Sequence, residues 1–204
     1  ATGKYPAWYT GRRFLNPTSI WVAGKTTQQT REVIQDALLG DITDIGTGTI
    51  PKECIVGTPT MKGGVPGTVE VLRVKHVSGG FSTITFKSYE QGREVFQGTY
   101  KHIIWLDEEP RDMSVYTECL TRTMHKVNPG IVLCTFTPLF GMSELVLSFM
   151  PGGRIPESGS SADQPDKFAV QVGWNEVPHM DESQKKALLD SYKPWERAAR
   201  SRGI

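Results

Sequence analysis

Apolar residues occur along this chain in short runs that end at glycine, proline or charged residues. Such runs are typical of strands that are buried on both faces of a parallel sheet. The pattern predicts three of them, at Ser19 to Ala23, Ile103 to Leu106 and Ile131 to Thr135. A fourth short strand is expected at Phe168 to Val172, after a stretch rich in proline, glycine and serine.

Two further segments, Val69 to Val77 and Phe81 to Phe86, are rich in β-branched and aromatic residues. The residues between them, Ser78-Gly79-Gly80, are typical of a turn, so together the two segments predict a β-hairpin. In a mainly parallel sheet this hairpin is an insertion or an antiparallel edge.

Helical patterns lie between the predicted strands. The longest, Lys25 to Leu39, begins with a possible capping box of Thr26 and Gln29 and ends at Gly40. Its apolar stripe is expected to consist of Val33, Ile34, Ala37 and Leu38. Other helices are predicted at Gln91 to Gln97, Met113 to Thr123, Ser143 to Met150 and Asp181 to Tyr192. Strands that alternate with helices predict an α/β fold with a mainly parallel sheet.

The length of 204 residues is sufficient for one sizeable core. Residues Asp41 to Gly67 are expected to form loops, and Pro151 to Asp166 is the clearest linker. We therefore predict a core at 1–150, a loop or linker at 151–166 and a terminal part at 167–204.

Charge and cysteine content exclude few functions. The 23 basic and 22 acidic residues nearly balance, so the total charge does not indicate a polyanionic partner. The three cysteines lack the spacing of a zinc site or a disulfide framework, which fits a reducing cytoplasm. No apolar run approaches the roughly 20 residues that cross a membrane, and no signal peptide is visible. Five basic residues precede the first acidic residue and form either a phosphate-binding patch or a solvated surface: Lys4, Arg12, Arg13, Lys25 and Arg31.

The most informative motif is Ile103-Ile104-Trp105-Leu106-Asp107-Glu108-Glu109-Pro110, an apolar strand that runs into acidic residues. In P-loop nucleoside triphosphatases an acid at this point holds Mg²⁺, and a second acid can position the attacking water. Asp107 and Glu108 can divide these tasks only where the strand ends, because side chains alternate along a strand. The alternative is that the carboxylates merely cap a following helix.

A phosphate-binding loop is harder to find. Gly24-Lys25-Thr26 resembles the end of GxxxxGK[ST], but the first glycine of that pattern would fall on Ser19. Residues Ser19 to Ala23 are also predicted to be the strand itself, whereas a phosphate cradle needs a loop of free backbone N–H groups. We therefore interpret Gly24-Lys25-Thr26 as a strand-to-helix turn, and expect the cradle to lie upstream of Ala1.

Several segments, in the same order, resemble the large terminase subunit of tailed bacteriophages. Thr2 to Phe14 resembles the segment after that family's Walker A helix, and Ile104 to Pro110 resembles its Walker B block. Thr135 to Gly141 is similar to the motif that couples hydrolysis to movement. Further similar segments are Trp21 to Gly24, Thr30 to Glu32, Gln35 to Gly40, Phe86 to Gly98, Pro178 to Asp181 and Trp195 to Ile204, the last two resembling the segment before the nuclease domain.

The resemblance implies a RecA-like (ASCE) P-loop fold with an inserted β-hairpin, truncated at its N-terminus, with the nuclease domain expected after Ile204. It implies an ATPase that drives double-stranded DNA into a procapsid, using ATP and Mg²⁺. The implied partners are the portal protein of the procapsid, the small terminase subunit and further copies of the chain in a ring. The implied location is the host cytoplasm, without a membrane. Without a phosphate loop, this chain alone is expected to be nearly inactive.

The resemblance also assigns roles to individual residues. Asp107 is expected to hold Mg²⁺ and Glu108 to polarise the attacking water, whereas Glu109 is expected to be a helix cap or a surface charge. Thr135 and Thr137 are expected to sense the γ-phosphate, the alternative being ordinary turn chemistry before Pro138. Candidates for an arginine finger are Arg93, which is favoured, and Arg122; the alternative for each is an ion pair on a helix surface.

Two other functional classes are compatible with the sequence. A helicase-like translocase shares the apolar strand that runs into Asp107 and Glu108, although no motifs of a second motor domain are visible. A non-catalytic assembly or DNA-binding module would depend on the basic first third of the chain, not on Asp107, and would show a steep salt dependence of DNA binding.

Overall fold

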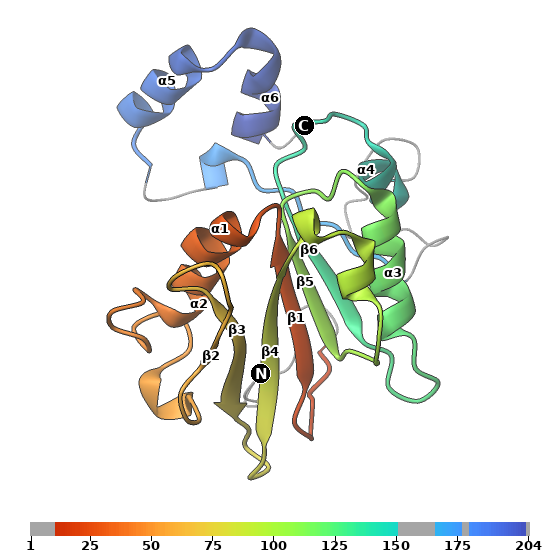
Figure 1. Cartoon of the computed structure of the whole chain (residues 1–204). Coiled ribbons are helices and arrows are strands. Elements are labelled where there is room, and N and C mark those ends of the chain that lie inside the picture. The colour runs from red at the N-terminus through yellow and green to blue at the C-terminus, as the bar shows by residue number, and fades with distance from the viewer. Residues whose placement is uncertain (1–10, 151–165, 177–179, 203–204) are drawn as a thin grey trace. The chain divides into compact units, whose positions relative to one another are not determined.

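The computed structural model describes residues 11–150, 166–176 and 180–202 (Figure 1). The chain forms two compact units that divide between Thr135 and Phe136. The predicted linker at 151–166 lies almost wholly outside the described residues.

The first unit is built on a six-stranded mixed sheet with the strand order β2-β3-β4-β1-β5-β6. Strands β4, β1, β5 and β6 run parallel, while β2, β3 and β4 pair antiparallel. The strands are β1 (Ser19–Gly24), β2 (Thr60–Met61), β3 (Val69–Lys75), β4 (Phe81–Ser88), β5 (Ile103–Asp107) and β6 (Ile131–Thr135). The α/β fold expected from the sequence is therefore confirmed.

The predicted hairpin is present, but its two strands have different roles. Strand β3 belongs to the antiparallel edge, as one of the two alternatives predicted, and the short strand β2 extends that edge. Strand β4 pairs antiparallel with β3 and parallel with β1, so it is an interior strand of the sheet. The hairpin is therefore part of the sheet.

The long helix predicted after β1 is formed by three consecutive segments, α1 (Thr27–Gln29), the π-helical η1 (Thr30–Gln35) and α2 (Asp36–Leu39). Thr26 caps its start, where the side-chain oxygen accepts a hydrogen bond from the backbone N–H of Gln29 at 3.0 Å. This confirms that Gly24-Lys25-Thr26 is a strand-to-helix turn. Gly40 follows the last helical residue with φ +80, which suits glycine.

The apolar stripe predicted for this helix is confirmed for Ile34 and for Leu38, which packs against the core cluster, and wrong for Val33 and Ala37. The side chain of Ile34 is buried as expected, but Val33 and Ala37 are exposed, and the helix instead buries Gln35 and Leu39. The π-helical turn explains the difference, because its wider turn changes which residues share a face.

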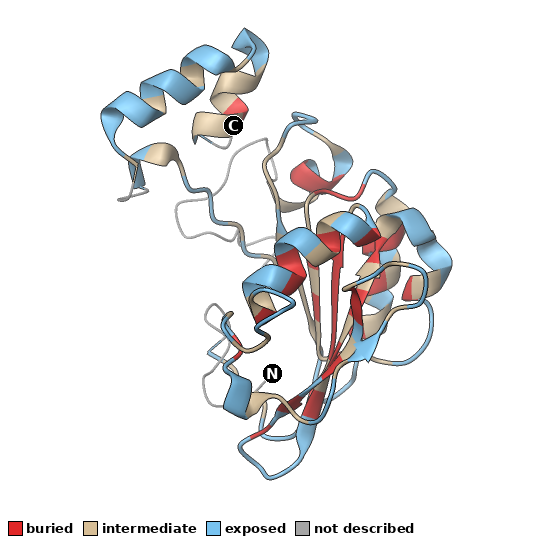
Figure 2. Cartoon of the chain, turned by 60° about the vertical axis from the view of Figure 1, so that its left-hand side comes forward, coloured by how far each residue is buried: buried red, intermediate tan, exposed pale blue. Residues whose placement is uncertain are grey.

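Helices cover both faces of the sheet. Ile34 and Leu39 pack in one apolar cluster with Val22 of β1, on the face that the first helix covers (Figure 2). The neighbouring residue Trp21 points to the other face, because side chains alternate along a strand, and there its ring meets Phe96. Phe96 belongs to η4 (Arg93–Phe96), which packs against α3 (Met113–Thr123). A one-turn 3₁₀ helix, η3 (Tyr89–Gln91), connects β4 to η4.

The remaining part of the first unit includes the short 3₁₀ helix η2 (Lys52–Cys54) within the loops expected at Asp41 to Gly67. The helix predicted at Gln91 to Gln97 takes the form of the 3₁₀ helices η3 and η4. The predicted bounds of α3 and β6 are confirmed as Met113–Thr123 and Ile131–Thr135.

The described part of the second unit consists of helices joined by segments without regular secondary structure. It contains α4 (Glu144–Phe149), η6 (Trp174–Glu176), α5 (Glu182–Ser191) and α6 (Pro194–Arg202), of which η6 and α6 were not expected. The strand predicted at Phe168 to Val172 is wrong, since this segment forms no strand and its large apolar side chains are exposed. A β-branched pattern forms a strand only where a neighbouring strand pairs with it. Among the described residues, no helix is long and apolar enough to cross a membrane.

Candidate active site

At the carboxyl end of β5, the strand that runs into acidic residues, three side chains are joined by hydrogen bonds. Asp107 is the last residue of β5 and lies opposite Thr135 of β6. The hydroxyl of Thr135 lies 2.7 Å from Oδ1 of Asp107, and the indole Nε1 of Trp105 lies 2.7 Å from the same hydroxyl. Because an indole N–H can only donate, the Thr135 oxygen accepts from Trp105 and its proton points to Asp107. The structure therefore orients one oxygen of the Asp107 carboxylate.

The Asp107 carboxyl group is half-buried, and burial raises its pKa above the ordinary value. The hydrogen bond from Thr135 opposes this rise, the neighbouring Glu108 adds to it, and the charge of Lys25 lowers the pKa. A carboxylate with a pKa perturbed by burial and by specific charged neighbours is a candidate for a functional group.

Glu108 leaves the strand in an unusual conformation. Its φ of +64 lies in the left-handed region, and it is the one non-glycine residue with a positive φ in the described part of the chain. Its backbone N–H donates to the carbonyl of Thr135 at 2.7 Å. Such a conformation costs roughly 1–3 kcal/mol and is concentrated at functional sites. The regular alternation of side chains along β5 therefore ends at Glu108, which is the condition under which Asp107 and Glu108 could both serve one site.

Lys25 contacts this acid pair, a relation that the sequence did not indicate, since it placed Lys25 only in a turn and among the early basic residues. Its Nζ lies 3.5 Å from Oε2 of Glu108. Both side chains are about a third exposed or more, so the ion pair contributes at most about 1 kcal/mol to stability. Lys25 follows β1 directly and Glu108 follows β5, and these adjacent parallel strands bring the two residues together.

Tyr89 is a second residue that the sequence did not identify. Its hydroxyl lies 3.0 Å from the carbonyl oxygen of Asp107, 3.0 Å from that of Glu108 and 3.3 Å from that of Ala23. Burial, together with nearby carboxylates, raises the pKa of Tyr89 far above its ordinary value, so the hydroxyl stays protonated and can donate.

Glu109 differs from its expected role. Its side chain is buried, with 4% exposure, so it is not a surface charge. Asp112 caps α3, since its Oδ1 accepts a hydrogen bond from the Ser114 N–H at 2.8 Å. The cap role expected for Glu109 at the following helix therefore belongs to Asp112.

The two arginine-finger candidates converge on one carboxylate. Nε of Arg93 lies 3.6 Å from Oε2 of Glu118, and Nη2 of Arg122 lies 2.9 Å from Oε1 of Glu118. This is the ion-pair arrangement that the sequence left open as an alternative. The contact does not test a role of either arginine towards a neighbouring subunit.

The two threonine candidates lie in different units. Thr135 is joined to Asp107, as described above. Thr137 belongs to the second unit, where its carbonyl accepts a hydrogen bond from the Leu139 N–H at 2.7 Å. For Thr137 the structure thus shows turn geometry around Pro138.

Two of the early basic residues form ion pairs with acidic side chains. Lys25 pairs with Glu108, and Nη2 of Arg31 pairs with Oε1 of Glu32 at 2.9 Å. Lys4 lies outside the described residues. These pairs do not decide between a phosphate-binding patch and a solvated surface.

The oxygen ligands at the acid pair fit Mg²⁺. Mg²⁺ is usually bound through one or two carboxylates, together with water and substrate phosphates. Asp107 and Glu108 provide two carboxylates beside a hydroxyl that fixes one oxygen. Within the described ranges, no group of three or more His, Cys, Asp or Glu side chains able to hold a metal occurs.

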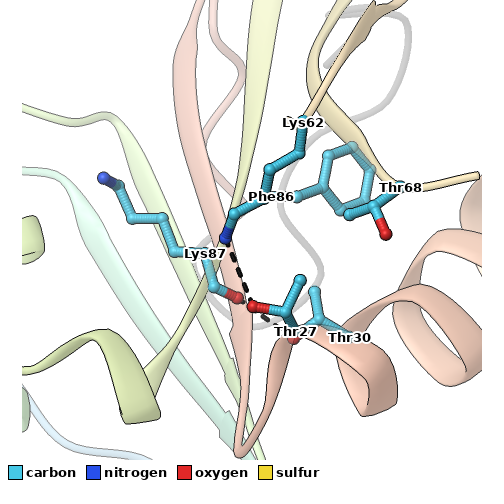
Figure 3. Close-up of a pocket in the computed structure, with 6 residues that line it drawn as sticks. All are labelled: Thr27, Thr30, Lys62, Thr68, Phe86 and Lys87. Atoms are coloured by element: carbon cyan, nitrogen blue, oxygen red, sulfur yellow. Dashed lines mark hydrogen bonds between the residues drawn. The ribbon is translucent and has the colours of Figure 1, made fainter. Parts of the chain in front are cut away.

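A small pocket lies elsewhere, between the first helix and β4 (Figure 3). In it, Nζ of Lys62 donates to the hydroxyl of Thr27 at 3.2 Å, and the Thr27 and Ser88 hydroxyls are 3.1 Å apart. These groups serve to attach the start of the helix to β4 and to the residue that follows β2. The acid pair, not this pocket, is therefore the candidate active site.

Comparison with known proteins gives one family. The family described as "Terminase large subunit, T4likevirus-type, N-terminal" matches residues 2–204. The large terminase subunit of Salmonella phage P22 is 37% identical over 215 aligned residues, which include all of this chain and 40% of the relative. The chain thus spans about two fifths of the length of that relative.

Solved structures give the same fold. The large terminase of a thermophilic bacteriophage, in complex with ATP-gamma-S, matches 93% of this chain and 40% of that chain, with a TM-score of 0.58 and 12% identity. The large terminase ATPase domain of Thermus phage P74-26 matches 94% of this chain and 79% of that chain, with a TM-score of 0.53 and 16% identity. The chain therefore has the fold of these ATPase domains.

Proposed function

The chain belongs to the terminase large-subunit family, and on this premise we propose that it is the ATPase part of a DNA-packaging motor. The observation that carries the proposal is the end of β5, where an oriented Asp107 is followed by Glu108 in a left-handed conformation. Two carboxylates at the carboxyl end of a parallel strand lie where open α/β sheets bind their ligands.

In this proposal Asp107 holds Mg²⁺ and Glu108 orients water. Bound Mg²⁺ supplies positive charge that neutralises the phosphates of ATP. The Thr135 hydroxyl fixes one Asp107 oxygen, and the second carboxylate oxygen would be the one available to hold the ion through its bound water. Glu108 accepts a hydrogen bond from the water that attacks the γ-phosphate, and Lys25 balances the charge beside it.

The threonines and Arg93 have supporting roles. Thr135 connects β6 to Asp107 directly, so a change at the γ-phosphate reaches the next strand and, through the chain, Thr137. Arg93 acts on the ATP of a neighbouring subunit in a ring, where its guanidinium stabilises the charge that develops during transfer. The Arg93 side chain is half-exposed, so release of its ion pair with Glu118 costs little.

The substrates and partners follow the same proposal. The motor moves double-stranded DNA into a procapsid through its portal protein, receives DNA from the small terminase subunit, and works as a ring of identical subunits in the host cytoplasm. The printed sequence contains no GxxxxGK[ST], so we expect the 204-residue chain by itself to bind ATP weakly and to hydrolyse almost none.

The experiment that tests the proposal compares two carboxylate variants. It uses the native protein and not the isolated 204-residue chain, which is expected to hydrolyse almost no ATP. Asp107→Asn should lower Mg²⁺-dependent ATP hydrolysis by about 100-fold or more, because the ion loses its charged ligand. Asp44→Asn is the matched control, since Asp44 is an exposed residue of a loop. Equal activity of the two variants would contradict the proposed function.

A further inference from the structure

The one-turn helix η3 is attached to the end of β1 at several points. Its start has a capping box, in which Ser88 and Gln91 bond each other's backbone N–H. The carboxylate of Glu90 accepts a hydrogen bond from the Thr27 N–H at 2.6 Å, and the N–H of Glu90 donates to the carbonyl of Lys25 at 3.1 Å. This turn therefore has a fixed position at the carboxyl edge of the sheet.

Tyr89 extends from this fixed turn across β1 to the end of β5. The order β4-β1-β5 places the three strand ends side by side (Figure 1). The hydroxyl has one proton and three carbonyl oxygens within 3.3 Å, those of Ala23, Asp107 and Glu108. A single donor is thus shared between the ends of β1 and β5.

The backbone of Glu108 is held on both sides. Its N–H donates to the carbonyl of Thr135, and its C=O faces the Tyr89 hydroxyl. Between these two attachments the residue has its φ of +64, which a glutamate adopts only when its surroundings hold it there. The direction of the Glu108 carboxylate therefore depends on both attachments.

We propose that Tyr89 is a positioning residue, whose hydroxyl holds Glu108 in its left-handed conformation and so aims the Glu108 carboxylate. The inference rests on the proposed function, because the carboxylate is aimed at the water of ATP hydrolysis. Tyr89 itself contacts the backbone of the acid pair, so it acts through Glu108.

The test is Tyr89→Phe in the native protein, which removes one oxygen and keeps the ring. We expect kcat for ATP hydrolysis to fall by about 10- to 100-fold, since small misplacements of a catalytic group have effects of this size. The KM for ATP should stay within about 2-fold, because Tyr89 bonds Asp107 only at its backbone carbonyl, whereas the Asp107 side chain keeps its hydrogen bond from Thr135. Tyr100→Phe is the matched control: its hydroxyl also bonds a backbone carbonyl, that of Asn128, at 2.6 Å.

A second variant and a structural measurement complete the test. Tyr89→p-aminophenylalanine keeps a donor at the same point, so it should fold and retain kcat even if Tyr89→Phe does not fold. A crystal structure of Tyr89→Phe should show residue 108 outside the left-handed region. A low kcat in the folded p-aminophenylalanine variant, or an unchanged kcat and φ in Tyr89→Phe, would overturn the inference.

The outcomes separate this inference from the proposed function. If Glu108→Gln abolishes hydrolysis while Tyr89→Phe keeps the parental kcat, the positioning role fails and the proposed function stands. If Glu108→Gln retains hydrolysis, the proposed function fails, and the φ of residue 108 in Tyr89→Phe still decides whether Tyr89 holds this backbone.

Discussion

Thr135 donates a hydrogen bond of 2.7 Å to Asp107, and the two residues lie opposite each other in the parallel strands β6 and β5. Trp105 determines the direction of this bond, because its indole N–H donates to the same hydroxyl. The contact connects the acid that we assign to Mg²⁺ with the strand that leads to the proposed coupling motif.

Thr135→Val is expected to shift the acid limb of the pH–activity profile to higher pH. The hydrogen bond from Thr135 lowers the pKa of Asp107, so its loss raises that pKa and protonates the carboxylate at a higher pH. The measurement is kcat/KM for Mg·ATP between about pH 5 and 9 in the native protein. The pH dependence of kcat/KM reports the pKa values of the essential groups of the free enzyme. Thr121→Val on α3 is the control. An acid limb that stays in place would show that the hydrogen bond does not influence the active carboxylate.

Asp107→Asn is expected to stabilise the protein at neutral pH. Burial raises the folded-state pKa of Asp107, so above the unfolded value of about 3.9 the folded state binds the proton more tightly than the unfolded state. Stability therefore falls as pH rises through the window between the two pKa values, and an uncharged side chain avoids this loss. Thermal unfolding at about pH 7 should show a midpoint about 1–3 °C higher, with a smaller gain near pH 3. A lower midpoint at neutral pH would contradict the sign.

Lys25 is expected to affect hydrolysis more than stability. Lys25→Met removes the positive charge beside Glu108, and we expect kcat to fall by about 10-fold, with unfolding changed by less than about 1 kcal/mol. Lys25→Arg keeps the charge and should recover part of the rate. Steady-state hydrolysis and urea unfolding of both variants measure the two effects. A large loss of stability with normal kcat would assign Lys25 a purely structural role.

The sequence was sufficient to predict the strand that carries the acid pair, but not the residues from other strands that contact this pair. The bounds of β5 follow from an apolar run that ends in charge, and Asp107 and Glu108 follow from it. Lys25 and Tyr89 could not be found in this way, because their relation to the acid pair arises from the pairing of β1 with both β4 and β5. Segments far apart in the chain meet there.

The buried face of the first helix shows a second limit of prediction from the sequence. Counting with the α-helical period places Val33 and Ala37 on the buried face, whereas the π-helical turn buries Gln35. The Gln35 amide compensates for its burial, because it donates to the Gly67 carbonyl at 2.9 Å and accepts from the Val69 N–H at 2.8 Å. A hydrogen bond between a helix and a distant strand carries no local sequence signal.

Gln35→Ala is therefore expected to destabilise the protein by about 1–3 kcal/mol, since it leaves two backbone groups near β3 without their side-chain partner. Gln28→Ala is the matched control, because the Gln28 amide bonds Glu32 at an exposed position on the same helix. Urea unfolding of the two variants gives the comparison. Equal midpoints would show that the buried amide contributes nothing to the attachment of the helix.

The most direct test of the central claim is single-turnover ATP hydrolysis by Glu108→Gln in the native protein. Glutamine keeps the size of the side chain but cannot take a proton from water, so the variant should bind ATP with near-parental affinity. Its chemical step should slow by about 100-fold or more, a loss typical of a general base. A chemical step at the parental rate would contradict the assignment of Glu108 as the residue that orients the attacking water.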